Sequence, residues 1–289
     1  MKNGLDTRPS PIAGQWYAAD ASHLAEQVDG YVEAAEMPEI REEVVAVIAP
    51  HAGHMYSGTV AGYAFATLKG LTPGIVAVIS PMHQPYYGEL FTTAHAAYQT
   101  PLGIIPVHQG ALNALDANLK SELGFGLTHV AEDGEHSLEI ELPFLQRVLE
   151  GDFQLLPVMV RDQSVRTALG LGNALAGLFQ AGGLLFKTPY IMVASTDLSH
   201  FYAQSEANRL DDKMLAAIES FDPELVIRTE EKGEGFACGR GAVAAVLQAS
   251  KILGADRVRR LHYATSGDVT REYSSVVGYG AAVVTRHTD

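Results

Sequence analysis

Histidines stand directly after three apolar segments of this sequence. The stretch "PHAGHMYSG" contains His51 and His54, "SPMHQPYYG" contains His83, and "STDLSHF" contains His200 together with Asp197. Neutral imidazoles combined with an anionic ligand are the set that iron, copper or zinc prefers in proteins. This pattern therefore predicts a mononuclear transition-metal site, provided that the fold brings the three stretches to one place.

The apolar segments before these histidines have the character of buried strands. Runs rich in valine and isoleucine occur at 43–49, 74–80, 153–160, 190–195 and 275–284, and segments of helical character at 59–69, 137–150, 163–181, 205–220 and 240–253. Continuous apolar character is typical of strands that are covered on both faces. Strands alternating with helices predict an α/β fold with a central, mostly parallel or mixed sheet flanked by helices. No repeat or long linker divides the chain, so we expect a single domain over residues 1–289.

Such a fold makes the positions of the histidines informative. In open α/β sheets, ligands bind beyond the carboxyl ends of the strands, so His51, His83 and His200 would reach the same edge of the sheet. We predict His51 and His83 as metal ligands. We predict His200 as an acid or base that Asp197 holds in orientation. Taken singly, each residue is also compatible with a structural role, and Asp197 could cap a following helix.

The only cysteine supplies the anionic ligand in this interpretation. Cys238 lies in "GFACGRGAVAAVLQASKI", between small residues, with Arg240 two positions on and a predicted helix following. A helix N-terminus and a nearby cation stabilise a thiolate, which is the form that binds metals. Gly239 and Gly241 leave room for a close approach of the backbone. The alternative is a cysteine buried as a small apolar side chain.

A further polar group occurs in "EDGEHSLEIELPFLQ". Glu135 and His136 precede Ser137, which could cap a helix and so place both side chains at its mouth. We predict that Glu135 and His136 orient the metal ligands from outside, or act as acid and base groups. Pro143 within the same predicted helix removes a hydrogen bond, so this helix is expected to start late or to bend.

The remaining histidines and the tyrosines near the motifs are assigned structural roles. Six histidines belong to this group: His54, His95, His108, His129, His262 and His287. The tyrosines that follow the histidine motifs could line a pocket, although aromatic packing is the preferred interpretation. They are Tyr56, Tyr86 and Tyr87.

Composition excludes several classes of function. With 20 Lys and Arg against 34 Asp and Glu, the chain of 289 residues has a formal net charge of −14, which disfavours binding to nucleic acids or anionic membranes. No stretch approaches the roughly 18 to 20 apolar residues that span a bilayer, and the N-terminal stretch contains no apolar segment of a secretion signal. A single cysteine forms no intrachain disulfide, which agrees with a reducing compartment. We therefore expect a cytoplasmic protein.

Taken together, these motifs resemble the MEMO family, whose bacterial and archaeal members are called AmmeMemoRadiSam system protein B. The resemblance extends from "RPSPIAGQWYAAD" through "PHAGHMYSG", "EHSLEIELPFLQ", "STDLSHF" and "CGRG" to "SVVGYGAAVV", which is nearly the whole chain. It implies a fold like that of the class III non-haem iron extradiol dioxygenases, in which two histidines and a carboxylate hold Fe(II). The family pattern puts a cysteine in place of that carboxylate.

Residue by residue, the resemblance assigns the two ligand histidines to His51 and His83 and the cysteine ligand to Cys238. It matches Asp197 and His200 to pocket residues beside the metal. One position departs from the pattern. The second motif commonly reads Gly-Pro-Asn/Ser-His, whereas here Met82 precedes the histidine, which changes the polarity around that ligand.

The resulting hypothesis is a mononuclear iron or copper protein, with zinc as a further alternative, that has redox or dioxygenase-like activity on an unknown small substrate. The family name also associates such proteins with a radical-SAM protein and an AMMECR1-like protein, which are expected as pathway partners by association only. The alternative is a non-catalytic module that uses the same pocket to bind a peptide or an anionic group. The sequence sets neither the reaction nor the oligomeric state.

Overall fold

The central sheet of this protein is mixed, and its strands are contributed from most of the chain. The computed structural model describes residues 6–37, 39–185 and 188–287, except for the side chains of residues 181–185. Within these ranges the sheet consists of nine strands: β2 (Glu43–Ala49), β3 (Ile75–Pro81), β4 (Leu90–Thr93), β7 (Thr128–Val130), β8 (Gln154–Val160), β9 (Tyr190–Ser195), β10 (His200–Tyr202), β11 (Arg257–Thr265) and β12 (Val276–Arg286). Eight of them follow the order β10-β12-β2-β9-β3-β8-β4-β7, and β11 is also paired with β12.

The middle of the sheet is parallel, antiparallel pairs flank it on both sides, and the edge strand β7 is again parallel to its neighbour β4. Strand β2 pairs in parallel with β9, β9 with β3, and β3 with β8, whereas β12 is antiparallel to β2, β11 to β12, and β4 to β8. The middle strands are buried on both faces, which is why they read as continuous apolar runs. The register places Ala49 beside Ser195 and Pro81 beside Val160. The chain therefore leaves β2, β3 and β9 at one edge of the sheet.

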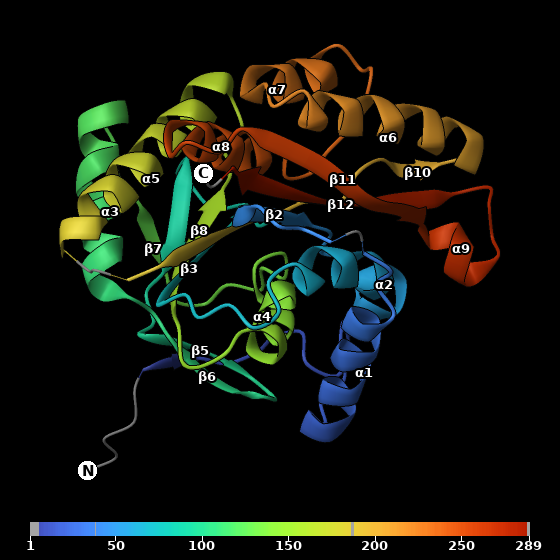
Figure 1. Cartoon of the computed structure of the whole chain (residues 1–289), viewed down its shortest axis with the longest axis horizontal. Coiled ribbons are helices and arrows are strands. Elements are labelled where there is room, and N and C mark those ends of the chain that lie inside the picture. Colours follow the sequence, from blue (N-terminus) through green and yellow to red (C-terminus); the bar gives the residue numbers. More distant parts are fainter. Residues whose placement is uncertain (1–5, 38, 186–187, 288–289) are drawn as a thin grey trace.

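Two groups of helices cover the two faces of the sheet (Figure 1). One group consists of α3 (Gln109–Leu123), α5 (Val165–Leu185), α6 (Gln204–Glu219), α7 (Pro223–Glu231) and α8 (Arg240–Ile252), and the other of α1 (Ala21–Glu33), α2 (His54–Ala66) and α4 (Leu142–Val148). Fully buried alanines at positions 242, 245 and 249 let α8 lie closely against β3 and β9. The short helix α9 (Ser266–Thr270) follows β11 at one margin of the fold. None of the described helices is both long and apolar enough to cross a membrane.

A second, three-stranded sheet lies beside α4 (Figure 1). It consists of β1 (Thr7–Arg8), β5 (Ala97–Thr100) and β6 (Gly103–Pro106), in the order β1-β5-β6. Pairing of β1 with β5 fixes the N-terminal segment against the body of the protein. This pairing brings Arg8 into contact with Asp133 and Glu139, in the segment that precedes α4.

The predicted α/β fold is confirmed, and all five predicted strands are present within two residues of their expected bounds. The sheet is mixed because β4, β11 and β12 add antiparallel pairs at its margins. Strand β11 had no clear apolar run, since most of its residues are only half-buried and several are arginines. The relationship to extradiol dioxygenases remains an implication of the family resemblance.

One helix prediction needs correction at its start, and a second helix starts late, as expected. The helix expected at 59–69 begins at His54, because Gly53 occupies its N-cap position and no side chain marks the start. In the segment expected to be helical at 137–150, α4 begins only at Leu142, after the short 3-10 turn η1 (Glu139–Glu141). Pro143 lies in the first turn of α4, where proline is tolerated, so the expected late start is confirmed. The expectation that Ser137 caps this helix is wrong, because its Oγ donates to the carbonyl of Pro81 at 2.8 Å.

Candidate metal centre

His51 lies directly beyond β2 and its ring is fixed at both nitrogens. The residue is only 2% exposed. Its backbone N donates to Oδ1 of Asp197 at 2.7 Å. Ring atom Nδ1 lies 2.8 Å from Oγ of Ser195, and Nε2 lies 3.1 Å from Sγ of Cys238. The imidazole is therefore held with Nε2 directed at the cysteine.

His83 lies beyond β3 and is held by the carboxylate of Glu135. The backbone N of His83 donates to Oε2 at 2.6 Å, and Nδ1 lies 2.9 Å from Oε1. Burial alone would raise the pKa of Glu135, but the hydrogen bonds and the charge of His83, together with the backbone N–H of Ser137, hold that pKa well below its usual range. Glu135 is thus ionised, and it orients His83 so that Nε2 is the nitrogen available to a ligand.

His136 comes from the loop before α4 and its ring packs between two others. It stacks on Trp16 at 4.1 Å and on His83 at 5.0 Å between ring centroids, and it meets the edge of His51 at 5.5 Å. Its backbone N donates to Oε1 of Glu135 at 3.0 Å. Burial lowers the pKa of His136 to about 4, so the ring is neutral at physiological pH.

These three histidines form a group with the spacing of metal ligands. One nitrogen of each of His51, His83 and His136 lies within 4.8 Å of the other two. Nitrogens bound at about 2.1 Å to one ion lie up to about 4.2 Å apart, so a small side-chain adjustment suffices to share an ion. Burial, and next the neighbouring His136 and His83, lower the pKa of His51 well below its usual value. A neutral imidazole is the form that binds a metal, so the group could hold a metal ion.

Cys238 touches this group through His51, in a setting that differs from the expected one. Helix α8 begins at Arg240, as expected, but the Arg240 guanidinium forms an ion pair with Glu230. Burial raises the pKa of the Cys238 thiol well above its usual value, and the nearby Asp197 charge adds to this effect. The expected stabilisation of the thiolate by the helix and the arginine is therefore wrong for the metal-free protein, in which the thiol is protonated.

Asp197 and His200 occupy the same edge of the sheet but do not form the expected pair. The Asp197 carboxylate accepts hydrogen bonds from the backbone N–H groups of His51 at 2.7 Å and Ala52 at 3.2 Å. Nδ1 of His200 instead lies 2.8 Å from the carbonyl of Leu198, which fixes its ring. Asp197 is also no helix cap, since α6 begins at Gln204. It anchors the loop that carries His51.

The electrostatics of Asp197 and His200 follow from their burial. Burial raises the pKa of Asp197 to about 7, against the opposing effect of the two backbone N–H donors from His51 and Ala52. Burial also lowers the pKa of His200. The His200 ring is therefore mostly neutral at neutral pH, whereas the Asp197 carboxyl is about half ionised there.

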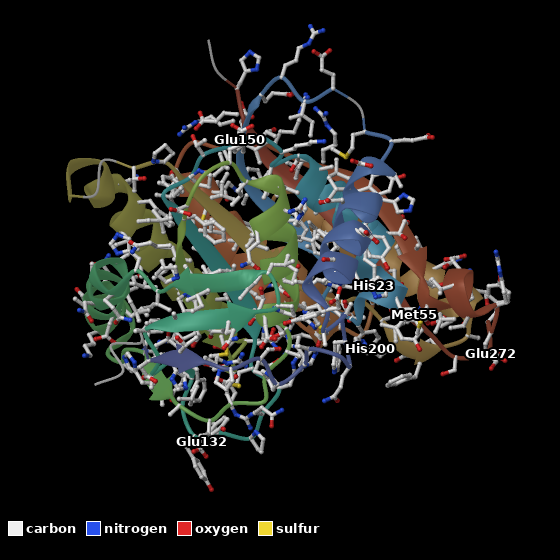
Figure 2. The ribbon with its side chains drawn as sticks, turned by 90° about the horizontal axis from the view of Figure 1, so that it is seen from below. His23, Met55, Glu132, Glu150, His200 and Glu272 are labelled. Carbon is white, nitrogen blue, oxygen red and sulfur yellow. The ribbon has the colours of Figure 1, made fainter. Side chains whose placement is uncertain are left out.

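A cavity of about 770 Å³ opens beside the three histidines. Its lining includes His51, His83, His136, Asp197, His200, Trp16, Tyr56 and Glu272. Figure 2 shows the labelled side chains of His200, Met55 and Glu272 at the same side of the molecule. The lining residue Phe201 is 75% exposed, so a large apolar side chain lies at the mouth of the cavity. The cavity is large enough for a small organic molecule or the side chains of a peptide.

Comparison with known proteins identifies the family. A family model described as Memo-like protein matches residues 8–283. This chain belongs to the Memo-like family. A MEMO1 family protein of Nitrosopumilus maritimus is 33% identical over 278 residues, which cover 95% of this chain and 98% of the relative. A second, from Methanosarcina mazei, is 34% identical over 280 residues, covering 97% and 100%. A third, from Thermotoga maritima, is 32% identical over 288 residues, covering 96% and 99%. The family resemblance inferred from the motifs is confirmed.

In this Memo-like protein, the structure assembles the sequence-predicted residues at one edge of the sheet. His51 and His83 lie together, and Cys238 contacts His51. Glu135 has the orienting position that was expected of it. His136 was expected outside the ligands, but its ring belongs to the group of three histidines. The sequence interpretation underestimated His136 because its motif follows no apolar strand.

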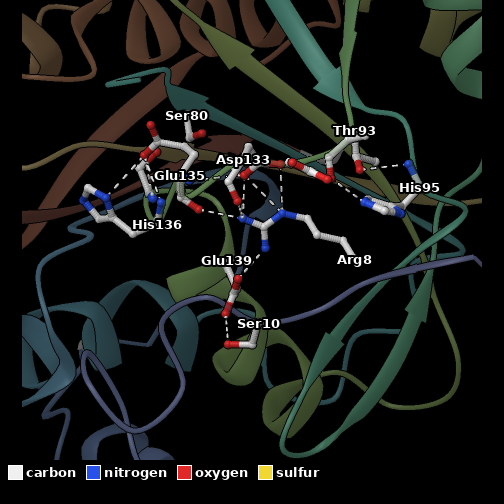
Figure 3. Close-up of polar contacts among 12 residues, drawn as sticks. Arg8, Ser10, Ser80, Thr93, His95, Asp133, Glu135, His136 and Glu139 are labelled. Atoms are coloured by element: carbon white, nitrogen blue, oxygen red, sulfur yellow. Dashed lines mark hydrogen bonds and ion pairs between the residues drawn. The ribbon is translucent and has the colours of Figure 1, made fainter. Parts of the chain in front are cut away.

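One buried network of the Memo-like protein had no counterpart in the sequence interpretation. Figure 3 shows the guanidinium of Arg8 between the side chains of Asp133 and Glu139, with Glu135 and His136 nearby. Arg8 lies 2.5 Å from Asp133 Oδ1 and 2.5 Å from Glu139 Oε2, and it donates to the carbonyl of Glu135 at 2.9 Å. The network fixes both ends of the loop that carries Glu135 and His136. The partners of Arg8 are more than 120 positions away in the chain, so no local sequence pattern indicates them.

Five of the six histidines that were assigned structural roles have contacts of that kind, and the sixth, His287, is exposed. Nε2 of His54 lies 3.0 Å from the carbonyl of Ile140, and its ring meets the edge of Phe144 at 4.9 Å. The other contacts join His95 to Ala131, His108 to Ala111, His129 to Thr93 and His262 to Tyr63. Among the tyrosines, Tyr56 lines the cavity, Tyr86 donates to the carbonyl of Glu132, and Tyr87 is fully exposed.

Proposed function

We propose that this protein binds one iron or copper ion through His51, His83 and Cys238, with zinc as the remaining alternative. The observation that carries the proposal is the convergence of His51, His83 and His136 within ligand spacing. The Sγ atom of Cys238 adds a sulfur 3.1 Å from Nε2 of His51. A sulfur at about 2.3 Å and a nitrogen at about 2.0 Å from one ion lie at most about 4.3 Å apart, so this pair is able to share an ion.

The donor set supports a redox metal. Imidazoles suit iron, copper and zinc alike, and a thiolate shifts the preference towards copper and other softer ions. Loss of the thiol proton of Cys238 is expected on metal binding, because a cysteine ligand binds a metal as the thiolate and the charge of the ion offsets the effect of burial on its pKa. His136 lies close enough to serve as a further ligand or as a base beside the ion.

A bound iron or copper ion would supply electron transfer and sites for a small substrate or dioxygen. The chain supplies the remaining parts. The carbonyl of Leu198 accepts from Nδ1 of His200 at 2.8 Å, which leaves Nε2 of His200 as a proton acceptor at the cavity wall. Trp16 and Tyr56 form aromatic walls that orient an organic substrate and exclude water. We therefore propose a redox or dioxygenase-like reaction on a small molecule, with His200 as acid or base.

Elemental analysis of protein that is purified anaerobically without a metal-affinity tag tests the metal assignment. The wild type is expected to contain about one iron or copper per chain, and the variants His83→Gln and Cys238→Ser are expected to lose most of it. The exposed His23 provides the matched control, since His23→Gln removes a histidine outside the cavity. Full loading of Cys238→Ser contradicts the cysteine ligand, and full loading of His136→Gln assigns His136 to the base position.

An alternative function is favoured by the apolar rim of the cavity. The lining residues Phe201 and Tyr56 expose 75% and 37% of their surface, which suits the docking of a peptide segment. The variant His200→Ala separates the two functions. Loss of turnover with metal retained supports the enzyme, whereas unchanged binding of a peptide together with no turnover in the wild type supports a non-catalytic module.

Partners and location complete the proposal. The family association supports a pathway with a radical-SAM protein and an AMMECR1-like protein, and co-purification of the three proteins from one cell extract tests it. The net charge of −14 argues against nucleic acid and anionic membranes as partners. A lone cysteine that must remain reduced to bind metal is consistent with the cytoplasm, and fractionation of cells provides the check.

A further inference from the structure

The hydroxyl of Ser195 lies among three polar partners in the interior behind His51. Its Oγ is 2.8 Å from Nδ1 of His51, 2.7 Å from the carbonyl of Ser137 and 2.7 Å from Oε1 of Glu141. All four residues are at most 2% exposed. Water therefore cannot replace any of these partners, and the hydrogen bonds have to be satisfied within the group.

Counting protons assigns the direction of each hydrogen bond. A serine hydroxyl has one proton to donate and two lone pairs to accept with. The carbonyl of Ser137 can only accept, so the Ser195 proton goes to it. The two other contacts then require donors, which are Nδ1–H of His51 and a protonated Oε1 of Glu141. If Glu141 were ionised and Nδ1 of His51 carried no proton, three acceptors would compete for the single hydroxyl proton of Ser195.

The surroundings of Glu141 support a neutral side chain independently of this count. Its second oxygen, Oε2, is buried without a hydrogen-bond partner. A carboxylate with an unpaired buried oxygen is costly, whereas the neutral acid is much less so. Burial raises the pKa of Glu141 well above its usual value, and the charge of Asp197 acts in the same direction. Within the described residues, Glu141 takes part in no ion pair.

A neighbouring glutamate, Glu139, is equally buried but has a cation beside it. Glu139 is two positions away and equally enclosed, with 0% of its surface exposed. Its carboxylate pairs with Arg8 at 2.5 Å and accepts from Tyr17 at 2.6 Å. Every oxygen of Glu139 thus has a partner that stabilises negative charge, whereas Glu141 faces a hydroxyl.

We propose that Glu141 is a neutral carboxylic acid that donates to Ser195, and that Ser195 in turn fixes His51 as the Nδ1–H tautomer. Ser195 and Glu141 are positioning residues, because they act through His51 and touch neither cavity nor substrate. In this tautomer Nε2 carries a lone pair that is directed at Sγ of Cys238. Nε2 is then free to bind a metal ion next to that cysteine. The two ligand histidines then differ in the partner of Nδ1, which is an ionised carboxylate for His83 and a neutral hydroxyl for His51.

The tautomer and the protonation state concern the metal-free protein, while their consequence for metal affinity rests on the proposed function. Infrared spectroscopy of protein with isotope-labelled glutamate tests the acid at about pH 8, where exposed carboxyls are ionised. A label-sensitive carboxylic acid band is expected in the wild type, lost in Glu141→Gln and retained in Glu150→Gln, an exposed glutamate. Absence of a band that depends on Glu141 overturns the proposal.

Nuclear magnetic resonance of isotope-labelled histidine tests the tautomer, with the signal of His51 assigned by its loss in His51→Gln. The wild type and Glu141→Gln are expected to show Nδ1–H, because the glutamine amide still donates to Ser195. Ser195→Ala is expected to give a mixture of tautomers, and Ser195→Thr to restore the single form. An Nε2–H tautomer in the wild type overturns the proposal.

Metal titration completes the test. Ser195→Ala is expected to weaken iron or copper binding about 10- to 100-fold, and Ser195→Thr to restore most of it, as for other residues that orient a ligand. If the wild type binds no metal while both spectroscopic results hold, the proposed function fails and the assignment of Glu141 and Ser195 stands. If the wild type binds metal and Ser195→Ala binds it with the same affinity, the positioning role of Ser195 and Glu141 is contradicted.

Discussion

The carboxylate of Glu135 binds two nitrogens of the same residue, the backbone N of His83 at 2.6 Å and its ring Nδ1 at 2.9 Å. One side chain therefore fixes both the loop after β3 and the orientation of the imidazole on it. The same carboxylate accepts from the backbone N of His136 at 3.0 Å. Two of the three clustered histidines depend on one ionised group for their positions.

Glu135→Gln is expected to weaken metal binding with little change of fold. The amide has no negative charge, and it cannot accept with both of its terminal atoms, so at least one bond to His83 is lost. Loss of a carboxylate that supports a ligand histidine typically costs about 10- to 100-fold in metal affinity. Competition with a chelator measures the affinity, and circular dichroism checks the fold. Glu132→Gln, on the exposed part of the same loop, is the control, and equal affinities of the two variants would contradict the role of Glu135.

Arg8→Met is expected to destabilise the protein strongly. It leaves Asp133 and Glu139 buried without their cation, since the side chains of both are 0% exposed. Removing one partner of a buried ion pair costs about 3–5 kcal/mol in the free energy of unfolding. Arg147→Met removes a surface pair with Asp29 and is expected to cost at most about 1 kcal/mol. Urea unfolding of both variants measures the difference, and similar losses would show that the Arg8 network is not a main support of the fold.

Phe201→Gly is expected to stabilise the protein. Phe201 has a φ of 66° at an irregularity between β10 and β12, and its side chain is 75% exposed. A left-handed conformation costs a non-glycine residue about 1–2 kcal/mol, and little burial is lost with the ring. After the backbone entropy of glycine, a net gain of about 0.5–1 kcal/mol remains. Tyr202→Gly, at the next residue, is expected to destabilise, and thermal unfolding compares the two. A loss of stability in Phe201→Gly would show that its ring contributes to packing.

The strain at Phe201 also bears on function. A phenylalanine that is both strained and exposed does not stabilise the fold, because a glycine at this position would avoid the backbone strain. It lies beside His200 and lines the cavity next to the three histidines. An exposed ring in the wall of the cavity is suited to contact with a bound molecule.

The fold was predictable where the pattern of burial alone decides the structure. Strand β2 has the bounds expected from its apolar run, because both of its faces are covered. Helix α1 also has a pattern typical of a helix, with Leu24, Val28 and Val32 buried at a spacing of four and Asp20 capping the start. Strand order and the antiparallel pairs were not predictable in detail, because pairing depends on contacts between distant segments.

The site was predictable in its place and only partly in its chemistry. Polar residues beyond the carboxyl ends of β2, β3 and β9 had to meet at one edge, so His51, His83 and Asp197 were found. The hydrogen-bond partners of these residues depend on side-chain directions, which the spacing of residues in the sequence does not determine. Asp197 bonds the backbone of His51 and leaves His200 to the carbonyl of Leu198.

Acid is expected to destabilise the metal-free protein partly through His54. This residue is 3% exposed among aromatic rings, and burial lowers its pKa to about 4. The unfolded chain, with a pKa of about 6.5 for this group, binds more protons between pH 6.5 and 4, so the free energy of unfolding falls as the pH is lowered through that range. A difference of roughly 2.5 units corresponds to about 3 kcal/mol in total.

His54→Phe tests this contribution. The phenyl ring fits beside Phe144 and Tyr17 but does not titrate, so the curve of stability against pH becomes flatter by up to about 1.4 kcal/mol per pH unit between pH 6.5 and 4. Loss of the hydrogen bond to the carbonyl of Ile140 lowers stability by an amount that does not depend on pH, so the slope and not the offset is decisive. Urea unfolding at several pH values gives both. Equal slopes for wild type and variant would mean that His54 takes up its proton in the folded protein.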